Sequence, residues 1–252
     1  MPTSEVTVFV QARMSSSRLP GKVLLPIGGR PMLEHVVERA RAASTVSRLW
    51  VLTSTDRGDD PIADWCRSQA VECFRGSLHD VLDRFAAAAE RLPPDHTTIV
   101  RITADCPLTD PDVIDEVVNA LRAAPEAVYA ASRLPDKRTF PIGIDVEAFR
   151  REGLERARIA AWRPYQREHV TPWFYDGSES STPILVSADP AAGDERWTVD
   201  TAEDLELVRE IHERLPAGDL RWRTVEKLLD ENSHLRAINA KVRQKSYRET
   251  EK

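Results

Sequence analysis

The first half of the chain alternates between short apolar runs and longer stretches whose apolar positions recur every three or four residues. Short apolar runs are typical of buried strands, and the longer period is typical of helices. Strands are predicted at residues 6–11, 49–52, 71–74, 97–103 and 127–131, and helices at residues 31–43, 59–68, 77–92 and 110–123. This alternation predicts an α/β protein with a mostly parallel sheet flanked by helices.

Two of these helices carry start signals. Pro31 suits the first helical position of its segment, and Ser77 is the predicted N-cap of the helix at residues 77–92. The alternation breaks after Ser132. Beyond it, strands are predicted at residues 143–149 and 184–187, and helices at residues 151–161, 165–175 and 201–215, with an interruption at Pro172 and a cap at Thr201.

The chain is expected to fold as a single domain over residues 1–252. The break in the alternation marks an inserted segment at about residues 133–190. C-terminal helices and a charged tail are expected over residues 216–252, with the tail itself at 241–252.

Composition restricts the class of protein. The 252 residues are 41% hydrophobic and 30% charged, which favours a packed core over disorder. No apolar run approaches the roughly 20 residues that cross a bilayer, and the start of the chain lacks a signal-peptide pattern. We therefore expect no membrane association. Cys66, Cys73 and Cys106 are odd in number and show no metal-type spacing, which favours a reducing cytoplasm over a disulfide framework.

The charge pattern has one local exception. The net charge is −6, with 41 acidic and 35 basic residues, so non-specific nucleic-acid binding is not expected. Residues 13–22 nevertheless contain Arg13, Arg18 and Lys22 and no acidic residue. This acid-free stretch is the strongest candidate for binding an anion.

The acid-free stretch follows the first predicted strand, where open α/β sheets bind their ligands. Arginine forks two phosphate oxygens, lysine adds a point charge, and hydroxyls such as that of Ser17 fill further acceptors. The stretch therefore predicts a polyphosphate site, with a solvated basic loop as the alternative. It is neither a Walker A loop nor a dinucleotide fingerprint, because Val23 follows Gly21-Lys22 and no G-x-G-x-x-G occurs.

Carboxylates occur at corresponding places in the pattern. Asp105 follows the strand at residues 97–103, and Asp200 precedes the helix at residues 201–215. Together they offer the oxygen ligands that Mg²⁺ prefers, and the alternative for each is a helix or turn cap. Asp145 and Glu147 alternate and are expected on one face of a strand, either binding hydroxyls or facing solvent.

Five ordered segments resemble a known family. Residues 11–29, QARMSSSRLPGKVLLPIGG, closely resemble the signature of sugar-activating cytidylyltransferases. RITADCPL, RTFPIGIDVE, YQREHVTPWFY and RWTVDTAEDLELV follow in the order seen in the spore-coat-polysaccharide type. The resemblance covers about residues 6–212 and extends to the synthetases of CMP-activated ketodeoxyoctonate and sialic acid. It implies a Rossmann-like nucleotidyltransferase fold whose inserted segment serves acceptor binding and dimerisation.

The resemblance also implies roles for single residues. Arg13, Arg18 and Lys22 are implied to hold the triphosphate and stabilise the leaving pyrophosphate, and Asp105 and Asp200 to bind Mg²⁺. The implied nucleotide-binding set is Gln11, Ala12, Arg13, Ser17, Lys22, Asp80, Thr103 and Ala104. Within it, Asp80 is implied to accept from the exocyclic amine of cytosine. The implied acceptor-binding set is Asp145, Glu147, Arg167 and His169.

The implied reaction is Mg²⁺-dependent transfer of CMP from CTP to a sugar acid or a related small hydroxy or phospho compound, within glycan or specialised-metabolite biosynthesis. Relatives pair, so a homodimer is implied too. One alternative is a nucleotide-sugar-dependent glycosyltransferase, although the D-x-D patterns at Asp110-Pro-Asp112 and from Asp189 onward are poorly placed for a metal. The other is a non-catalytic nucleotide-sugar-binding subunit, which would be expected to lack the cations or the carboxylates.

Overall fold

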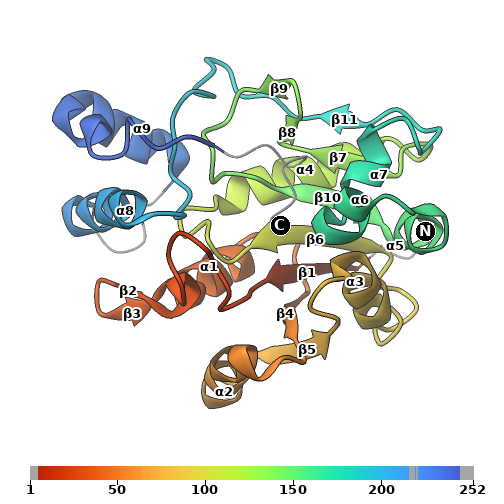
Figure 1. Cartoon of the computed structure of the whole chain (residues 1–252). Coiled ribbons are helices and arrows are strands. Elements are labelled where there is room, and N and C mark those ends of the chain that lie inside the picture. The colour runs from red at the N-terminus through yellow and green to blue at the C-terminus, as the bar shows by residue number, and fades with distance from the viewer. Residues whose placement is uncertain (1–4, 216–218, 220, 245–252) are drawn as a thin grey trace.

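The computed structural model describes residues 5–215, 219 and 221–244, and their strands form a seven-stranded sheet (Figure 1). The order across the sheet is β11-β7-β10-β6-β1-β4-β5. The strands are β1 (Val6–Gln11), β4 (Arg48–Ser54), β5 (Glu72–Gly76), β6 (Thr98–Thr103), β7 (Tyr129–Ala131), β10 (Glu147–Arg150) and β11 (Ile184–Leu185). β10 runs antiparallel to β6 and β7, whereas the other pairings are parallel. This confirms the predicted mostly parallel sheet.

Helices cover both faces of the sheet (Figure 1). In β1, Val8 and Val10 pack into one core cluster and Phe9 packs into the other. The first cluster includes side chains of α1 (Met32–Arg41), α2 (Asp60–Ser68), α4 (Pro111–Ala123), α8 (Ala202–Arg214) and α9 (Trp222–Glu231). The second includes side chains of α3 (Val81–Ala89), α5 (Arg151–Ala160) and α7 (Pro172–Tyr175). Burial on both faces explains why the strands read as apolar runs.

The segment at residues 133–190 contributes to the main body. It supplies β10 and β11 to the sheet and α5 to one face. Within it, the hairpin of β8 (Arg133–Leu134) and β9 (Lys137–Arg138) forms a separate two-stranded sheet. Helix α6 (Pro164–His169) precedes α7, and the predicted interruption at Pro172 is confirmed.

Two helix starts differ from the prediction. The helix predicted at residues 77–92 corresponds to α3, which begins at Val81. Asp80 is its N-cap and accepts a hydrogen bond from the backbone N–H of Asp83. Ser77 instead accepts from the backbone N–H of Asp80. Pro31 lies in β3 (Arg30–Pro31), which pairs with β2 (Pro26–Ile27), and serves as the N-cap of α1.

The strand predicted at residues 143–149 is also shorter, since β10 begins at Glu147. Gly143 has a φ of 108°, and a Cβ built there would lie 2.6 Å from the backbone nitrogen of Thr198. The backbone at 143 therefore packs against the segment that leads to Asp200, and glycine is required for this approach. Asp145 consequently lies in a loop and does not share a strand face with Glu147.

The described chain contains no helix with the length and apolar character that a membrane span requires. Cys66, Cys73 and Cys106 are all free thiols. Residues 241–244 of the predicted tail follow the 3₁₀ helix η3 (Ser233–Ala237), and its remaining residues, 245–252, lie outside the described residues.

Candidate active site at the carboxyl edge of the sheet

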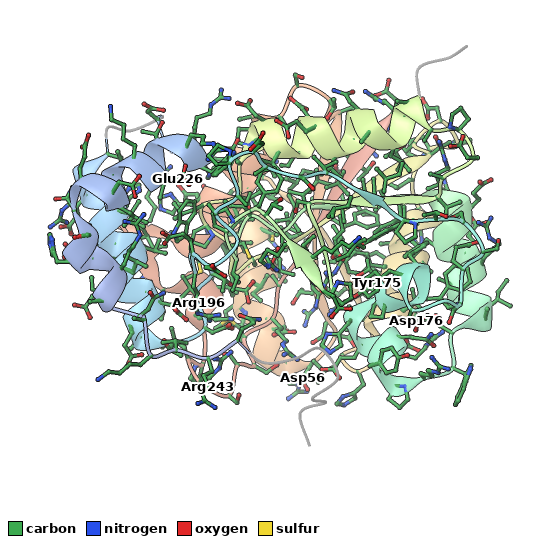
Figure 2. All side chains as sticks on the ribbon, turned by 90° about the horizontal axis from the view of Figure 1, so that it is seen from above. Asp56, Tyr175, Asp176, Arg196, Glu226 and Arg243 are labelled. Carbon is green, nitrogen blue, oxygen red and sulfur yellow. The ribbon has the colours of Figure 1, made fainter. Side chains whose placement is uncertain are left out.

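The basic loop leaves the sheet where three strands end. The backbone N–H of Ala12 donates to Leu52 at the end of β4, and that of Ala104 donates to Gln11 at the end of β1. Figure 2 shows Arg243 and Asp56 along one edge of the molecule, and Asp56, two residues after the end of β4, places it as the edge at which β4 ends. The sequence-based placement of the loop at a carboxyl edge is therefore confirmed.

Two contacts shape the loop. The backbone N–H of Gly21 donates to the carbonyl of Met14 at 2.9 Å, and Gly21 adopts a left-handed φ of 70°. The backbone N–H of Met14 donates to Oδ1 of the buried Asp59 at 2.7 Å. The loop then enters the 3₁₀ helix η1 (Lys22–Leu24), so Lys22 is held at the point where the loop turns back toward the sheet.

Lys22 joins the two predicted metal carboxylates. Its Nζ lies 2.7 Å from Oδ2 of Asp105, 2.8 Å from Oδ1 of Asp200 and 2.8 Å from the carbonyl oxygen of Val199. The backbone N–H of Val199 also donates to the carbonyl of Asp105 at 2.8 Å. Two carboxylates 95 positions apart in the sequence thus flank one ammonium group.

The opposite charges of Lys22 and the carboxylates lower the pKa of Asp105 and raise the pKa of Lys22. Burial by itself raises the pKa of Asp105, but the charge and hydrogen bond of Lys22 outweigh burial and lower it to about 2. Burial by itself lowers the pKa of Lys22, but the charges of Asp105 and Asp200 outweigh burial and raise it. The pairing therefore keeps both Asp105 and Lys22 ionised at neutral pH.

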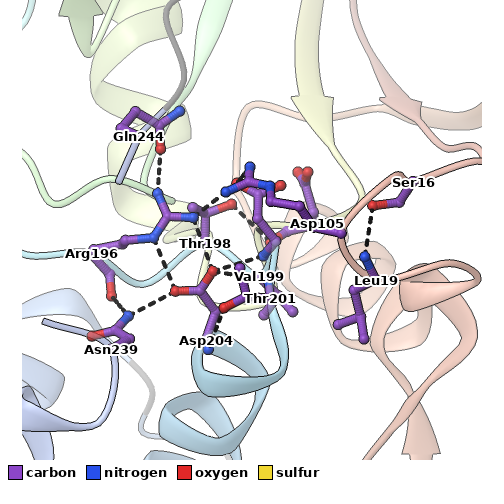
Figure 3. A network of polar contacts seen from close by, with 12 residues as sticks. Ser16, Leu19, Asp105, Arg196, Thr198, Val199, Thr201, Asp204, Asn239 and Gln244 are labelled. Atoms are coloured by element: carbon purple, nitrogen blue, oxygen red, sulfur yellow. Dashed lines mark hydrogen bonds and ion pairs between the residues drawn. The ribbon is translucent and has the colours of Figure 1, made fainter. Parts of the chain in front are cut away.

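A second layer of contacts holds Asp200. Its Oδ2 lies 3.0 Å from Arg18 and 2.9 Å from Arg196. Arg196 also donates to both carboxylate oxygens of the buried Asp204, at 2.9 Å each. Asn239 donates to the Arg196 carbonyl at 3.0 Å and to Asp204 at 2.9 Å, as Figure 3 shows.

The sequence did not predict these contacts of Arg196, Asp204 and Asn239. Arg196 and Asp204 lie in the motif RWTVDTAEDLELV, and Asp204 forms a capping box with Thr201. Asn239 lies far along the chain from that motif, and no local pattern marks it. The C-terminal segment therefore supports the candidate site through a contact that only folding creates.

One cavity, about 130 Å³ in volume, gathers most of the residues predicted around the nucleotide. Its lining consists of Gln11, Arg13, Ser16, Ser17, Arg18, Lys22, Val23, Thr103, Ala104, Asp105 and Asp200. Ala12 is buried beside it. The cavity thus combines hydroxyls and cations, which can bind phosphate oxygens, with two carboxylates, which can bind a divalent cation.

Asp80 and Arg167, which are predicted to contact cytosine and the acceptor, form an ion pair with each other. Oδ1 of Asp80 caps α3, and its Oδ2 accepts from Nε of Arg167 at 2.9 Å. Arg167 further donates to the carbonyl of Arg158 at 2.7 Å. The Asp80 carboxylate and the Arg167 guanidinium therefore face each other, and their expected contacts with cytosine and with the acceptor stay predictions.

The remaining predicted acceptor residues, Asp145, Glu147 and His169, are not among the residues that line this cavity. Asp145 accepts from Arg138 at 2.6 and 3.2 Å. Glu147 is buried and accepts from Arg101, from Tyr129 at 2.7 Å and from Thr171 at 2.7 Å.

Glu147 is buried and does not face solvent, whereas the Asp145 side chain is 24% exposed. Their expected role in acceptor binding stays a prediction. His169 is half-buried, and burial outweighs the charge of Glu168 and lowers its pKa, so the ring is neutral at neutral pH.

Acidification is expected to remove the stability that Asp105 contributes. Because its pKa falls from 3.8 to about 2 on folding, this contribution is present above pH 4 and is lost as the pH falls through about 2. The difference in unfolding free energy between wild type and Asp105→Asn is expected to narrow by on the order of 1–2 kcal/mol between pH ~5 and pH ~2.5. Urea unfolding at both pH values measures it, and an unchanged difference contradicts the prediction.

The comparisons with known proteins agree with this geometry. The family model described as cytidylyltransferase matches residues 7–213. An uncharacterized protein of Methanocaldococcus jannaschii is 36% identical over 96% of this chain and 98% of its own length. The spore coat polysaccharide biosynthesis protein SpsF of Bacillus subtilis is 31% identical, over 84% of this chain and 88% of its own.

Solved structures show the same fold. A cytidylyltransferase from Leptospira borgpetersenii superposes with a TM-score of 0.85 at 29% identity, covering 92% of this chain and 96% of the other. A CMP:2-keto-3-deoxy-manno-octonic acid synthetase complexed with CTP superposes with a TM-score of 0.63 at 21% identity, covering 84% and 99%. The chain belongs to the cytidylyltransferase family of CTP-dependent nucleotidyltransferases.

Proposed function

We propose that the chain transfers CMP from CTP to a sugar acid or a related small hydroxy or phospho compound and releases pyrophosphate. The observation that carries this proposal is the single cavity in which Arg13, Arg18 and Lys22 lie beside Asp105 and Asp200. The name of the B. subtilis relative refers to polysaccharide biosynthesis, and that of the CTP complex refers to a keto-octonic acid. Both support a sugar-acid acceptor and a role in glycan biosynthesis.

In the proposed reaction, an oxygen of the acceptor attacks the α-phosphorus of CTP, and the bond from that phosphorus to the bridging oxygen of pyrophosphate breaks. Arg13 and Arg18 provide positive charge for the leaving pyrophosphate, whose negative charge grows as the bond breaks. The serine hydroxyls of the loop orient the phosphates by hydrogen bonding. No side chain of the cavity forms a covalent bond with the nucleotide in this reaction.

The donor set in the cavity fits Mg²⁺. One oxygen of Asp105, one of Asp200 and the carbonyl of Val199 surround the Lys22 ammonium at 2.7–2.8 Å, and all three are oxygen ligands. The described residues contain no group of three or more His, Cys, Asp or Glu side chains placed to hold a metal. Asp105 and Asp200 would therefore share the ion with phosphate oxygens and water, where it would neutralise charge on the phosphates.

The structure disfavours a D-x-D metal site. Oδ1 of Asp110 accepts from the backbone N–H of Asp112 at 2.8 Å and its Oδ2 accepts from that of Trp222 at 2.7 Å, so the buried carboxylate caps α4. A homodimer and a cytoplasmic location stay predictions. Two exposed apolar side chains of the 133–190 segment, Ile159 and Trp162, support the former.

An assay of pyrophosphate release tests the proposed function. The protein is mixed with CTP, Mg²⁺ and a panel of ketodeoxyoctonate, nine-carbon sugar acids, aminosugars and phosphonates. We expect release with CTP and at least one acceptor, and a rate with UTP lower by ~10²-fold or more. Nucleotide binding without turnover across the panel would favour the binding-subunit alternative, and transfer from a nucleotide sugar would favour a glycosyltransferase.

A further inference from the structure

The Lys22 ammonium occupies the point at which the proposed metal ligands converge. An ammonium group has three N–H donors, and here each has an acceptor: Asp105, Asp200 and the Val199 carbonyl. The Lys22 side chain is only 10% exposed, so water contributes little to this arrangement. Lys22 therefore bonds to the proposed ligands of the metal and has no N–H left for a phosphate.

The two carboxylates are already neutralised by side chains. Asp105 pairs with Lys22, and Asp200 pairs with Lys22, Arg18 and Arg196. A divalent cation placed between the carboxylates would lie beside the ammonium and be repelled strongly, because like charges repel most at short range in a poorly hydrated site. Entry of the cation thus requires that the ammonium move away.

A triphosphate is the ligand that can move it. Lys22 lines the cavity together with Arg13, Arg18 and the serines of the loop, where a polyanion would bind. The lysine side chain is flexible and carries a point charge, so it can exchange the carboxylates for phosphate oxygens without a change in the backbone. The same polyanion supplies the negative charge that a divalent cation needs in place of the ammonium.

We propose that Lys22 is an internal counterion that excludes the divalent cation from the nucleotide-free chain, so that the cation enters only together with the nucleotide that withdraws the ammonium. The inference rests on the proposed role of Asp105 and Asp200 as the Mg²⁺ ligands. It makes Lys22 a positioning residue that sets the order of binding, in addition to its expected contact with the triphosphate.

Binding of Mn²⁺ to the nucleotide-free protein tests the inference, with free Mn²⁺ measured by electron paramagnetic resonance. Lys22→Met is compared with wild type and with Lys227→Met, whose lysine is 77% exposed on α9 and lies 3.9 Å from Glu231. We expect Lys22→Met to bind one additional Mn²⁺ per chain at least tenfold more tightly than wild type or Lys227→Met. The additional site is expected to disappear in Lys22→Met/Asp105→Asn.

Two results would overturn the inference: wild type that binds Mn²⁺ as tightly as Lys22→Met, or folded Lys22→Met that gains no site. Lys22→Gln, which keeps a polar side chain, replaces Lys22→Met if circular dichroism shows the latter unfolded. Because this measurement uses neither CTP nor an acceptor, its outcome is independent of turnover. A Mn²⁺ site gained by Lys22→Met, together with no pyrophosphate release by the wild type, would contradict the proposed reaction and leave the counterion role intact.

Discussion

Replacement of Asp105 by Asn is expected to lower pyrophosphate release from CTP on the order of 10³-fold in a protein that still folds. Asp105 follows β6, and its carboxylate is one of the two that contact Lys22. Asn keeps the shape of the side chain but removes its charge, and with it one of the two proposed Mg²⁺ ligands. Several kcal/mol of charge stabilisation depend on such a ligand, and about 1.4 kcal/mol corresponds to tenfold in rate.

Initial rates at saturating CTP and acceptor measure this effect, with circular dichroism as the test of folding. Asp64→Asn is the matched control, because the Asp64 side chain on α2 is 66% exposed and pairs with the exposed Arg67. The control is expected to retain the wild-type rate within about twofold, since an exposed ion pair of this kind contributes ~0.5 kcal/mol or less. Folded Asp105→Asn with more than a tenth of the wild-type rate would remove Asp105 from the mechanism.

Replacement of Glu147 by Ala is expected to lower the free energy of unfolding by about 3–5 kcal/mol, because it breaks a buried ion pair. Glu147 is only 2% exposed and accepts hydrogen bonds from Arg101, Tyr129 and Thr171. Burial by itself raises its pKa, but the charges of Arg101 and Arg133 outweigh burial and lower it, so the carboxylate is ionised. Its loss removes the carboxylate that pairs with Arg101, whose side chain is only 10% exposed.

Urea unfolding followed by circular dichroism measures the loss. Glu155→Ala is the control, because the Glu155 side chain on α5 is 56% exposed and lies 3.8 Å from Arg151. The control is expected to change stability by about 0.5 kcal/mol or less. Equal stabilities for the two variants would show that the buried pair contributes nothing, and Glu147 would then be available for the acceptor role that the resemblance implied.

The chemistry of the candidate site was largely predictable from local pattern. An apolar run that ends in a polar loop marks the carboxyl end of a buried strand, and parallel strands bring such ends to one edge. Gln11 ends β1 and the basic loop follows it. Thr103 ends β6, the neighbour of β1, and Ala104 and Asp105 follow it. Both groups consequently line one cavity.

The partners of single carboxylates were not predictable in the same way. Asp80 pairs with Arg167 across 87 residues, and Glu147 pairs with Arg101 across 46. Each residue type is compatible with a ligand, a cap or an ion pair, and only its three-dimensional neighbours distinguish these roles. The alternation along GIDVE wrongly predicted that Asp145 and Glu147 share one face of a strand. Gly143 approaches the backbone of Thr198 closely, and β10 begins only at Glu147.

By itself, the sequence determined the α/β architecture, the acid-free loop and its edge of the sheet, because periodicity and local charge are properties of neighbouring residues. The tertiary structure alone decided that Lys22 bonds to Asp105 and Asp200, and that Asn239 braces Arg196 and Asp204. Such contacts join residues far apart in the chain. Their geometry depends on how helices and loops pack on the sheet, and no local pattern encodes it.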